Sequence, residues 1–234
     1  MITEAIVLAG GFGTRLQSVV NDLPKPMAPV AGKPFLSYVL DYLANQGITH
    51  AVLSVGYRHE AIIRHFGNEY KNISLTYAIE KEPLGTGGAI KFAMQFIENE
   101  DFAVLNGDTI FKIDFSEFYR YHKHAQADLS IALRLVEDVS RYGTVLTKDK
   151  GRISDFLEKG QKAGAGKING GIYLLNKSII EKIANFTGNF SMEKDVFERY
   201  YATYSFYGFA FNEYFIDIGI PEDYHRAQVE LNLT

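Results

Sequence analysis

The chain has 234 residues, of which 47% are hydrophobic and 22% are charged, with a formal net charge of −4. This composition is typical of a globular protein, and the negative charge gives no electrostatic reason to bind nucleic acid or an anionic membrane. The absence of cysteine excludes disulfides, thiolate metal sites and a cysteine nucleophile. With no signal-peptide pattern and no apolar run of about 18 residues, we expect a cytoplasmic protein without a membrane span.

The first half of the chain alternates short apolar strands with amphipathic helices. We expect strands at residues 6–8, 50–55, 73–79 and 102–105, and helices at 35–43, 58–66 and 90–97. This order predicts a mostly parallel sheet with helices on both faces. Ligands of such sheets bind outside the carboxyl ends of the strands.

The second half is richer in short strands. We expect a helix at 115–125, a flexible loop at 162–167, and strands at 129–136, 143–147, 152–157, 168–175 and 204–211. Gly170 and Gly171 interrupt the strand at 168–175. Ser191 can cap a helix, with Lys194 where a capping-box glutamate would stand, and Pro221 begins a final helix. We therefore expect one domain, with a nucleotide-binding half at 1–111 and a sugar-phosphate-binding half at 112–234.

A glycine-rich stretch follows the first strand and is the strongest local signal. Its glycines allow a sharp turn and bring backbone N–H groups close to an anion. Arg15 and Lys25 add two cations that can neutralise phosphates. There is no Walker A run, and Leu16 stands where the third glycine of a dinucleotide fingerprint belongs. The stretch therefore predicts a triphosphate cradle of another kind, formed by Leu8, Ala9, Gly10, Gly11, Gly13 and Thr14.

Two aspartates stand beside glycines at the ends of apolar runs. Asp108 follows the strand at 102–105, and Asp217 lies in Phe215-Ile216-Asp217-Ile218-Gly219. Mg²⁺ needs only one or two carboxylates when phosphates and water complete its shell. We expect both aspartates to hold Mg²⁺, although either one alone could simply cap a turn.

Glu80 opens a second glycine-rich run that continues through Gly85 and Thr86. A carboxylate can accept both N1–H and N2–H of guanine, whereas uracil presents one donor between acceptors and suits an amide better. Glu80 or Glu82 thus favours guanine, and a solvated loop acid is an equal alternative. Farther along, Lys159 could hold a sugar phosphate and Glu158 could accept sugar hydroxyls, and Gly143 and Asn169 could add contacts to a sugar; the family resemblance described below implies the same role for Asn106. Each of these is also consistent with a structural role.

Together these motifs resemble the sugar-1-phosphate nucleotidyltransferase family over essentially the whole chain. The likeness is carried by residues 8–16, 24–26, 32–34, 85–88, 106–108, 158–159, 169–173 and 217–224. It implies a Rossmann-like three-layer αβα sandwich with a mixed, mostly parallel central sheet, of the GT-A-like type. It also implies transfer of a nucleotide from an NTP to a sugar 1-phosphate with Mg²⁺. Arg15, Lys25 and Asp108 would then be catalytic, and Asp108 and Asp217 metal ligands.

Within the family, residues 80–90 and 168–173 are most similar to heptose 1-phosphate guanylyltransferases. The resemblance implies GTP and a sugar 1-phosphate as substrates and a role in glycan biosynthesis. A mannose-1-phosphate guanylyltransferase, an N-acetylmuramate-1-phosphate uridylyltransferase and a non-catalytic nucleotide-sugar sensor remain alternatives. One departure is Ile220, where many members have threonine. The sequence does not determine the oligomeric state.

Overall fold

The computed structural model describes residues 1–11, 23–140, 142–183 and 186–232. Its strands are β1 (Glu4–Leu8), β2 (Pro29–Val30), β3 (Lys33–Pro34), β4 (His50–Val55), β5 (Glu69–Tyr70), β6 (Ile73–Ile79), β7 (Asp101–Asn106), β8 (Thr109–Phe111), β9 (Leu129–Val136), β10 (Thr144–Thr147), β11 (Ile153–Leu157), β12 (Gly166–Asn176), β13 (Phe206–Phe211) and β14 (Phe215–Asp217). Its α-helices are α1 (Phe35–Asn45), α2 (His59–Phe66), α3 (Gly85–Ala93), α4 (Phe115–His124), α5 (Lys177–Lys182), α6 (Glu198–Tyr200) and α7 (Pro221–Glu230). Short 3₁₀ turns occur at η2 (Lys25–Met27), η3 (Met94–Phe96) and η4 (Asp149–Gly151), and η5 (Met192–Phe197) is a π-helix.

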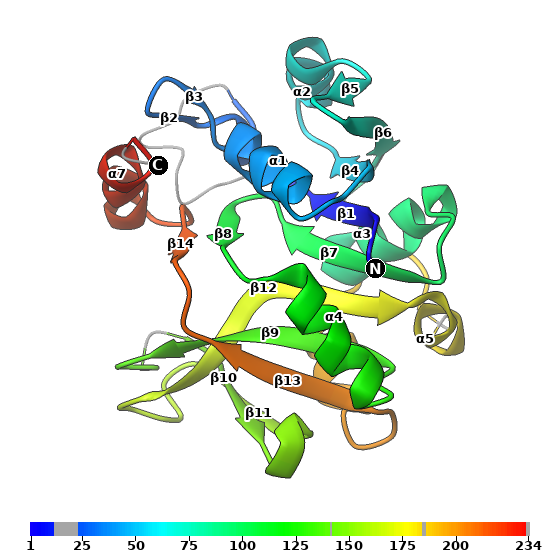
Figure 1. The fold of residues 1–234 in the computed structure, drawn as a ribbon, viewed down its shortest axis with the longest axis vertical. Helices are drawn as coiled ribbons and strands as arrows, with labels where there is room; N and C mark the ends of the chain where they lie inside the picture. Colours follow the sequence, from blue (N-terminus) through cyan, green and yellow to red (C-terminus); the bar gives the residue numbers. More distant parts are fainter. Residues whose placement is uncertain (12–22, 141, 184–185, 233–234) are drawn as a thin grey trace.

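One large mixed sheet runs through the molecule (Figure 1). Its parallel part has the order β7-β1-β4-β6, so the strands expected in the first half of the chain pair as predicted. Antiparallel β12 continues the sheet beyond β7, and β10 and β11 follow it. The mixed, mostly parallel arrangement of the core expected from the sequence is confirmed.

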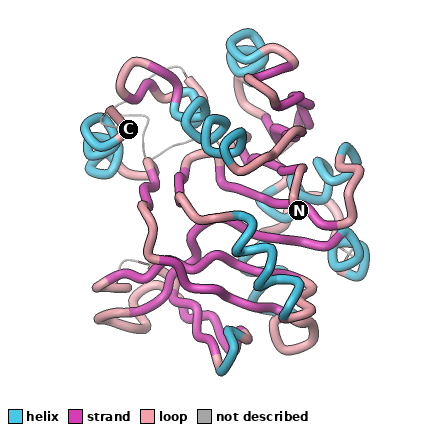
Figure 2. The backbone as a smooth tube through the Cα atoms, viewed as in Figure 1, coloured by secondary structure: helices cyan, strands magenta, loops and turns pink. Residues whose placement is uncertain are grey.

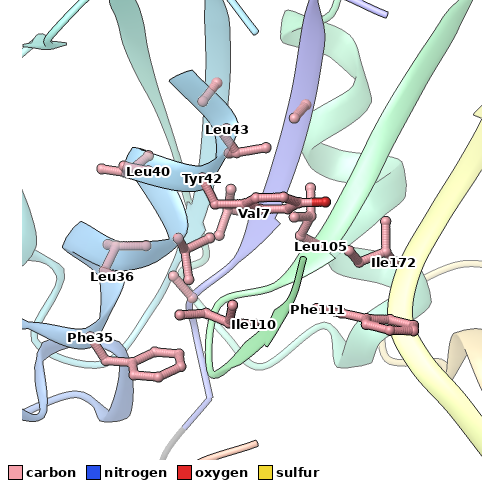
Figure 3. Close-up of a cluster of buried hydrophobic side chains, with 14 of the residues drawn as sticks. Val7, Phe35, Leu36, Leu40, Tyr42, Leu43, Leu105, Ile110, Phe111 and Ile172 are labelled. Atoms are coloured by element: carbon pink, nitrogen blue, oxygen red, sulfur yellow. The ribbon is translucent and has the colours of Figure 1, made fainter. Parts of the chain in front are cut away.

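Helices cover both faces of this sheet, which makes three layers. Alternate side chains of β1 point to opposite faces: Val7 packs with α1, whereas Ile6 packs with α3. Figure 3 shows Leu36, Leu40 and Leu43 of α1 over β1 and β7. Because both faces are buried, these strands are continuously apolar, as parallel strands between helix layers are.

The second half of the chain extends the sheet with strands rather than crossover helices (Figure 2). β9 pairs antiparallel with β12 and parallel with β13. The register between β9 and β12 shifts between Asn169 and Tyr173, and Gly171 has φ of +74° there. The interruption expected at Gly170 and Gly171 is therefore a bulge within one continuous strand, because β12 can absorb two extra residues where glycine accepts a positive φ.

A separate two-stranded ribbon joins the two halves of the chain. β14 pairs antiparallel with β8, and Asp217 faces Thr109 in the register. In addition, the Ile218 amide donates to the Asp108 carbonyl at 3.0 Å. This pairing brings the segment that contains Asp217 to the end of β7, more than a hundred positions earlier in the sequence.

The bounds of two expected segments were wrong, and one expected helix cap is present. Helix α3 begins at Gly85, and Met94–Phe96 is a 3₁₀ turn, so the expected helix at 90–97 starts and ends earlier. Gly166 already belongs to β12, so the loop at 162–167 is shorter. The Ser191 cap is confirmed, but Asp195 rather than a residue at 194 returns to the Ser191 amide, at 2.8 Å. In the described part of the chain, no helix combines the length and apolarity needed to cross a membrane.

Candidate active site

A cavity of about 780 Å³ opens at the carboxyl ends of β1, β4, β6 and β7. Segments that follow each of these strands line it, as the rule for parallel sheets predicts. The described residues that line it are Leu8, Gly10, Gly11, Gly56, Tyr57, Arg58, His59, Glu60, Ile79, Glu80, Lys81, Glu82, Pro83, Gly85, Thr86, Ala89, Asn106, Asp108, Asn189 and Glu193. The cavity therefore collects the predicted nucleotide segments with two residues of the second half, Asn189 and Glu193.

Lys25 holds the two predicted metal-binding aspartates together. Its ammonium forms an ion pair and hydrogen bond with Asp108 Oδ2, and it lies 3.7 Å from Asp217 Oδ1. The Lys25 side chain is only 13% exposed, on a turn between Pro24 and Pro26. The convergence of Lys25, Asp108 and Asp217 expected from the sequence is thus present in the fold.

The Asp217 carboxylate is oriented by its own loop. The Gly219 amide donates to Asp217 Oδ1 at 2.7 Å, and a Cβ at Gly219 would lie 2.9 Å from that oxygen. Partial burial and, next, the negative charge of Asp108 raise the pKa of the Asp217 carboxyl to about 6. Two carboxylates this close are stabilised by a cation between them, and Lys25 supplies one.

The donor set is consistent with a magnesium site. Asp108, which lines the cavity, and Asp217, which shares Lys25 with it, both offer carboxylate oxygens, and Mg²⁺ typically takes one or two carboxylates with phosphate and water. Within the described ranges no cluster of three or more His, Cys, Asp or Glu side chains could enclose a metal. A metal here would therefore depend on substrate phosphates for much of its coordination.

The Glu80 carboxylate lies close to Gly10, which follows β1. Its Oε1 accepts from Ser54 Oγ at 2.9 Å, and its Oε2 accepts from the Leu84 amide at 3.1 Å. A Cβ at Gly10 would come within 2.9 Å of Glu80 Oε1, so only glycine fits there without a shift. Since a carboxylate has about four acceptor positions, Glu80 retains capacity for two further donors from a ligand in the cavity.

The glycines at the start of α3 lie against a segment of the second half of the chain. A Cβ at Gly85 would lie 2.5 Å from the Phe190 carbonyl, and one at Gly88 would lie 2.6 Å from the Gly188 carbonyl. The Gly87 amide donates to the Phe190 carbonyl at 3.0 Å. These glycines let another segment of the protein approach α3 closely, although Gly85 and Thr86 also line the cavity.

The predicted sugar-phosphate residues are divided by the structure. Asn106 lines the cavity, next to Gly107, whose amide donates to the Leu8 carbonyl at 2.9 Å. The other four predicted residues do not line the cavity: Gly143, Glu158, Lys159 and Asn169. Gly143, Glu158 and Lys159 are exposed, and Asn169 donates to the Tyr173 hydroxyl at 2.8 Å. Their contact with a sugar phosphate stays a prediction.

Part of the predicted cradle cannot be placed. Gly13, Thr14 and Arg15 lie outside the described residues. Gly10 and Gly11 line the cavity, as does Leu8. Ala9 is buried, and its amide donates to the Ser54 carbonyl at 2.8 Å, which ties the start of the glycine stretch to β4.

Two groups of cavity residues were missed in the sequence. The segment from Gly56 to Glu60 follows β4, so its place at a carboxyl strand end was an available signal. Glu193 stands two residues after the Ser191 cap, among the acids of the first turn. Nothing local distinguishes such an acid from one that stabilises the helix dipole.

The model of the family described as "Nucleotidyl transferase" matches residues 4–233. The chain belongs to this family. Within it, the chain is 50% identical to a D-glycero-α-D-manno-heptose 1-phosphate guanylyltransferase of Aneurinibacillus thermoaerophilus, over 97% of this chain and 98% of that protein. It is 46% identical to a protein of the same name from Campylobacter jejuni, over 95% and 97% of the two chains.

A solved structure shares the fold. The crystal structure of HddC from Yersinia pseudotuberculosis complexed with GMP-PN aligns with a TM-score of 0.87 and 41% identity. The alignment covers 98% of this chain and 100% of that one. The agreement extends over both halves of the sheet, so the family fold and this chain's fold are the same.

Proposed function

We propose that this protein is a D-glycero-α-D-manno-heptose 1-phosphate guanylyltransferase. It transfers GMP from GTP to heptose 1-phosphate, which yields GDP-heptose and pyrophosphate. The observation that carries the proposal is the 50% identity to a protein of that name across nearly the full length of both chains. The cavity has a glycine-rich rim and Asp108 in its lining, and Asp108 pairs with Lys25 beside Asp217, so the chemistry that such a reaction needs is at hand. Since GTP is a cytoplasmic nucleotide, the reaction belongs to the cytoplasm.

The nucleotide is assigned to the cavity side formed by residues 1–111. Leu8, Gly10 and Gly11 line it together with Glu80, Gly85 and Thr86. The remaining predicted contacts of this half are Ala9, Gly13, Thr14, Arg15 and Lys25. Glu80 is the acceptor that we assign to the guanine edge, because its carboxylate can take two donors.

The transfer is an in-line displacement at the α-phosphorus of GTP. An anionic oxygen of the sugar phosphate forms the new P–O bond, and the bond to the bridging α–β oxygen breaks as pyrophosphate leaves. The attacking oxygen is already ionised at neutral pH, so no protein base is required. Lys25 and Arg15 offset the charge that gathers on the phosphoryl oxygens and on pyrophosphate.

Asp108 and Asp217 would hold Mg²⁺ at the junction of the two substrates. When bound, the metal supplies Lewis-acid stabilisation of the phosphoryl oxygens. The two aspartates would present their carboxylates side by side to the metal. The Gly219 amide orients the Asp217 carboxylate through a hydrogen bond of 2.7 Å. Residues 112–234 are assigned to the sugar phosphate, with Gly143, Glu158, Lys159 and Asn169 and, from the first half, Asn106.

A pyrophosphate-release assay tests the proposal with a panel of substrates. The purified protein is given GTP, UTP, dTTP or ATP with heptose 1-phosphate, mannose 1-phosphate or N-acetylmuramate 1-phosphate in the presence of Mg²⁺. We expect the highest kcat/KM for GTP with heptose 1-phosphate. Faster turnover of UTP, or of mannose 1-phosphate with GTP, would contradict the proposed specificity, and nucleotide binding without any turnover would indicate a sensor.

The change Glu80→Gln tests the guanine contact. A charged acceptor to a nucleobase donor contributes about 1.5–3 kcal/mol, so kcat/KM for GTP should fall by about 10-fold to 100-fold. The matched control is Glu82→Gln, an exposed neighbour in the same cavity wall. If only Glu82→Gln lost activity with GTP, the contact with guanine would be assigned to Glu82 instead of Glu80.

A further inference from the structure

Glu193 is half-buried and lines the cavity, and the reaction described above gives its carboxylate no role. It lies on the π-helix η5, directly after the Ser191 cap. A π-helix is rare and frequently occurs at a functional site. Here the following acid, Asp195, turns back to the Ser191 amide at 2.8 Å, and Glu193 instead lines the cavity.

The Glu193 side chain is held by hydroxyl groups from two segments. Its Oε2 accepts from Thr86 Oγ1 at 2.8 Å and from Ser191 Oγ at 2.9 Å. Thr86 Oγ1 in turn accepts from the Met192 amide at 2.8 Å, so its proton is directed to Glu193. These bonds fix the carboxylate across the boundary between α3 and the second half of the chain. A carboxylate with about four acceptor positions still has room for ligand donors.

A buried tyrosine connects Glu193 to a predicted sugar residue. Tyr173 is 1% exposed, and its hydroxyl accepts from Asn169 Nδ2 at 2.8 Å. Burial and, next, the charge of the nearby Glu193 raise the pKa of the Tyr173 hydroxyl well above its ordinary value. Glu193 and Asp108 line the same cavity, together with Asn106.

The chemistry of this place restricts its occupant. A fixed carboxylate repels the triphosphate and the sugar's phosphate, but it accepts strongly from neutral hydroxyl donors. Asp108 marks where the two substrates' phosphates meet under the proposed mechanism. The group that stands next to those phosphates and presents hydroxyls is the ring of the sugar 1-phosphate.

We propose that Glu193 accepts hydrogen bonds from hydroxyls of the transferred sugar and thereby contributes to sugar specificity. Tyr173 and Asn169 act as positioning residues that hold Glu193. This inference rests on the proposed function, because it takes the acceptor to be a sugar 1-phosphate. It adds a contact from the π-helix to the sugar site.

The closing experiment separates sugar contacts from nucleotide contacts without turnover. Titration calorimetry with Mg²⁺ measures Kd for GDP and for GDP-heptose on the wild type and on Glu193→Gln. A hydrogen bond to a charged acceptor contributes about 10-fold to 100-fold in affinity, so we expect GDP-heptose to lose that factor while GDP changes less than about twofold. In steady state, KM for heptose 1-phosphate should rise by a similar factor at constant KM for GTP.

Two further variants distinguish recognition from a structural clamp. Tyr173→Phe removes only the buried hydroxyl and should raise KM for heptose 1-phosphate by a smaller factor, again without affecting KM for GTP. Glu181→Gln, an exposed acid on α5, serves as the matched control and should leave both constants unchanged. Thermal melting of each variant reports whether the fold is intact.

The inference is overturned if Glu193→Gln weakens GDP and GDP-heptose equally, because Glu193 would then contact ribose or merely clamp α3. Unchanged affinity for both ligands would overturn it as well. Failure of the proposed function looks different, since the wild type would then turn over another NTP or sugar phosphate in the panel. In that case the same comparison is made with the nucleoside diphosphate and the nucleotide sugar that the wild type does form.

Discussion

Lys25 is the residue whose contacts link the two halves of the site. It reaches Asp108 at the end of β7 and Asp217 on β14, and it is largely enclosed. A lysine with a partner on either side is a fixed point charge rather than a mobile surface group. It stabilises the pair of carboxylates in the free protein, and it stands beside the position assigned to the phosphates.

The change Lys25→Met should lower kcat by about 10²-fold to 10³-fold, the loss that follows removal of one preorganised charge-stabilising group. The rate falls because no ammonium group then offsets the negative charge on the phosphoryl oxygens. Initial rates of pyrophosphate release measure it. The matched control is Lys123→Met, which breaks the lysine–carboxylate pair with Asp101 at 2.9 Å away from the cavity. Equal losses in both variants would show that the effect is general destabilisation.

At the scale of the element, the bulge in β12 positions Asn106 of β7. Gly171 has φ of +74°, and a Cβ there would lie 2.7 Å from Asn106 Nδ2. The Gly171 amide donates to Asn169 Oδ1 at 2.9 Å, so the bulge also orients Asn169. One glycine thus sets two of the residues predicted to face the sugar phosphate.

The change Gly171→Ala should destabilise the fold and also lower activity. An L-residue held at positive φ costs about 1–3 kcal/mol, and the new methyl group must displace Asn106. Gly47→Ala is the matched control, because Gly47 has φ of +81° with nothing within 4 Å of the added Cβ. Urea unfolding and KM for the sugar phosphate are compared for both. If the control loses as much stability and activity as Gly171→Ala, the contact with Asn106 is unimportant.

At the scale of the whole molecule, the pH dependence of the folding stability involves one histidine, which is buried where α4 packs on the sheet. His122 is 2% exposed, and its Nδ1 lies 2.8 Å from Ser130 Oγ of β9. Burial lowers the pKa of His122 from 6.5 to about 4, with Asp101, Lys123 and Asp128 as the nearby charges. The folded protein therefore holds this imidazole neutral.

Because the unfolded chain binds the proton more readily, His122 contributes stability above about pH 6.5 that is lost as the pH falls towards 4. A difference of this size corresponds to about 3 kcal/mol. His122→Gln, which cannot titrate, should show a smaller decline in the free energy of unfolding between pH 7 and pH 4.5. Taking the difference between the two proteins in urea removes the contributions of the other titrating groups. Parallel declines would contradict the assignment to His122.

Local signals in the sequence predicted most elements and part of the site. The strands β4, β6 and β9 could be predicted from hydrophobic periodicity alone, so their predicted bounds agree with the structure. The glycines of α3 were harder to interpret. Their composition indicates close approach, but Phe190, which comes close, lies about a hundred positions farther along the chain.

The sequence by itself determined the order of strands and helices, the carboxyl-end location of the site and the family motifs, because each depends on neighbours in the chain or on strand direction. Only the tertiary structure decided that Asp217 meets Lys25 through the β8–β14 ribbon and that Glu193 enters the cavity from a π-helix. Such contacts depend on pairing and packing between distant segments, and no local pattern of residue types specifies the partner.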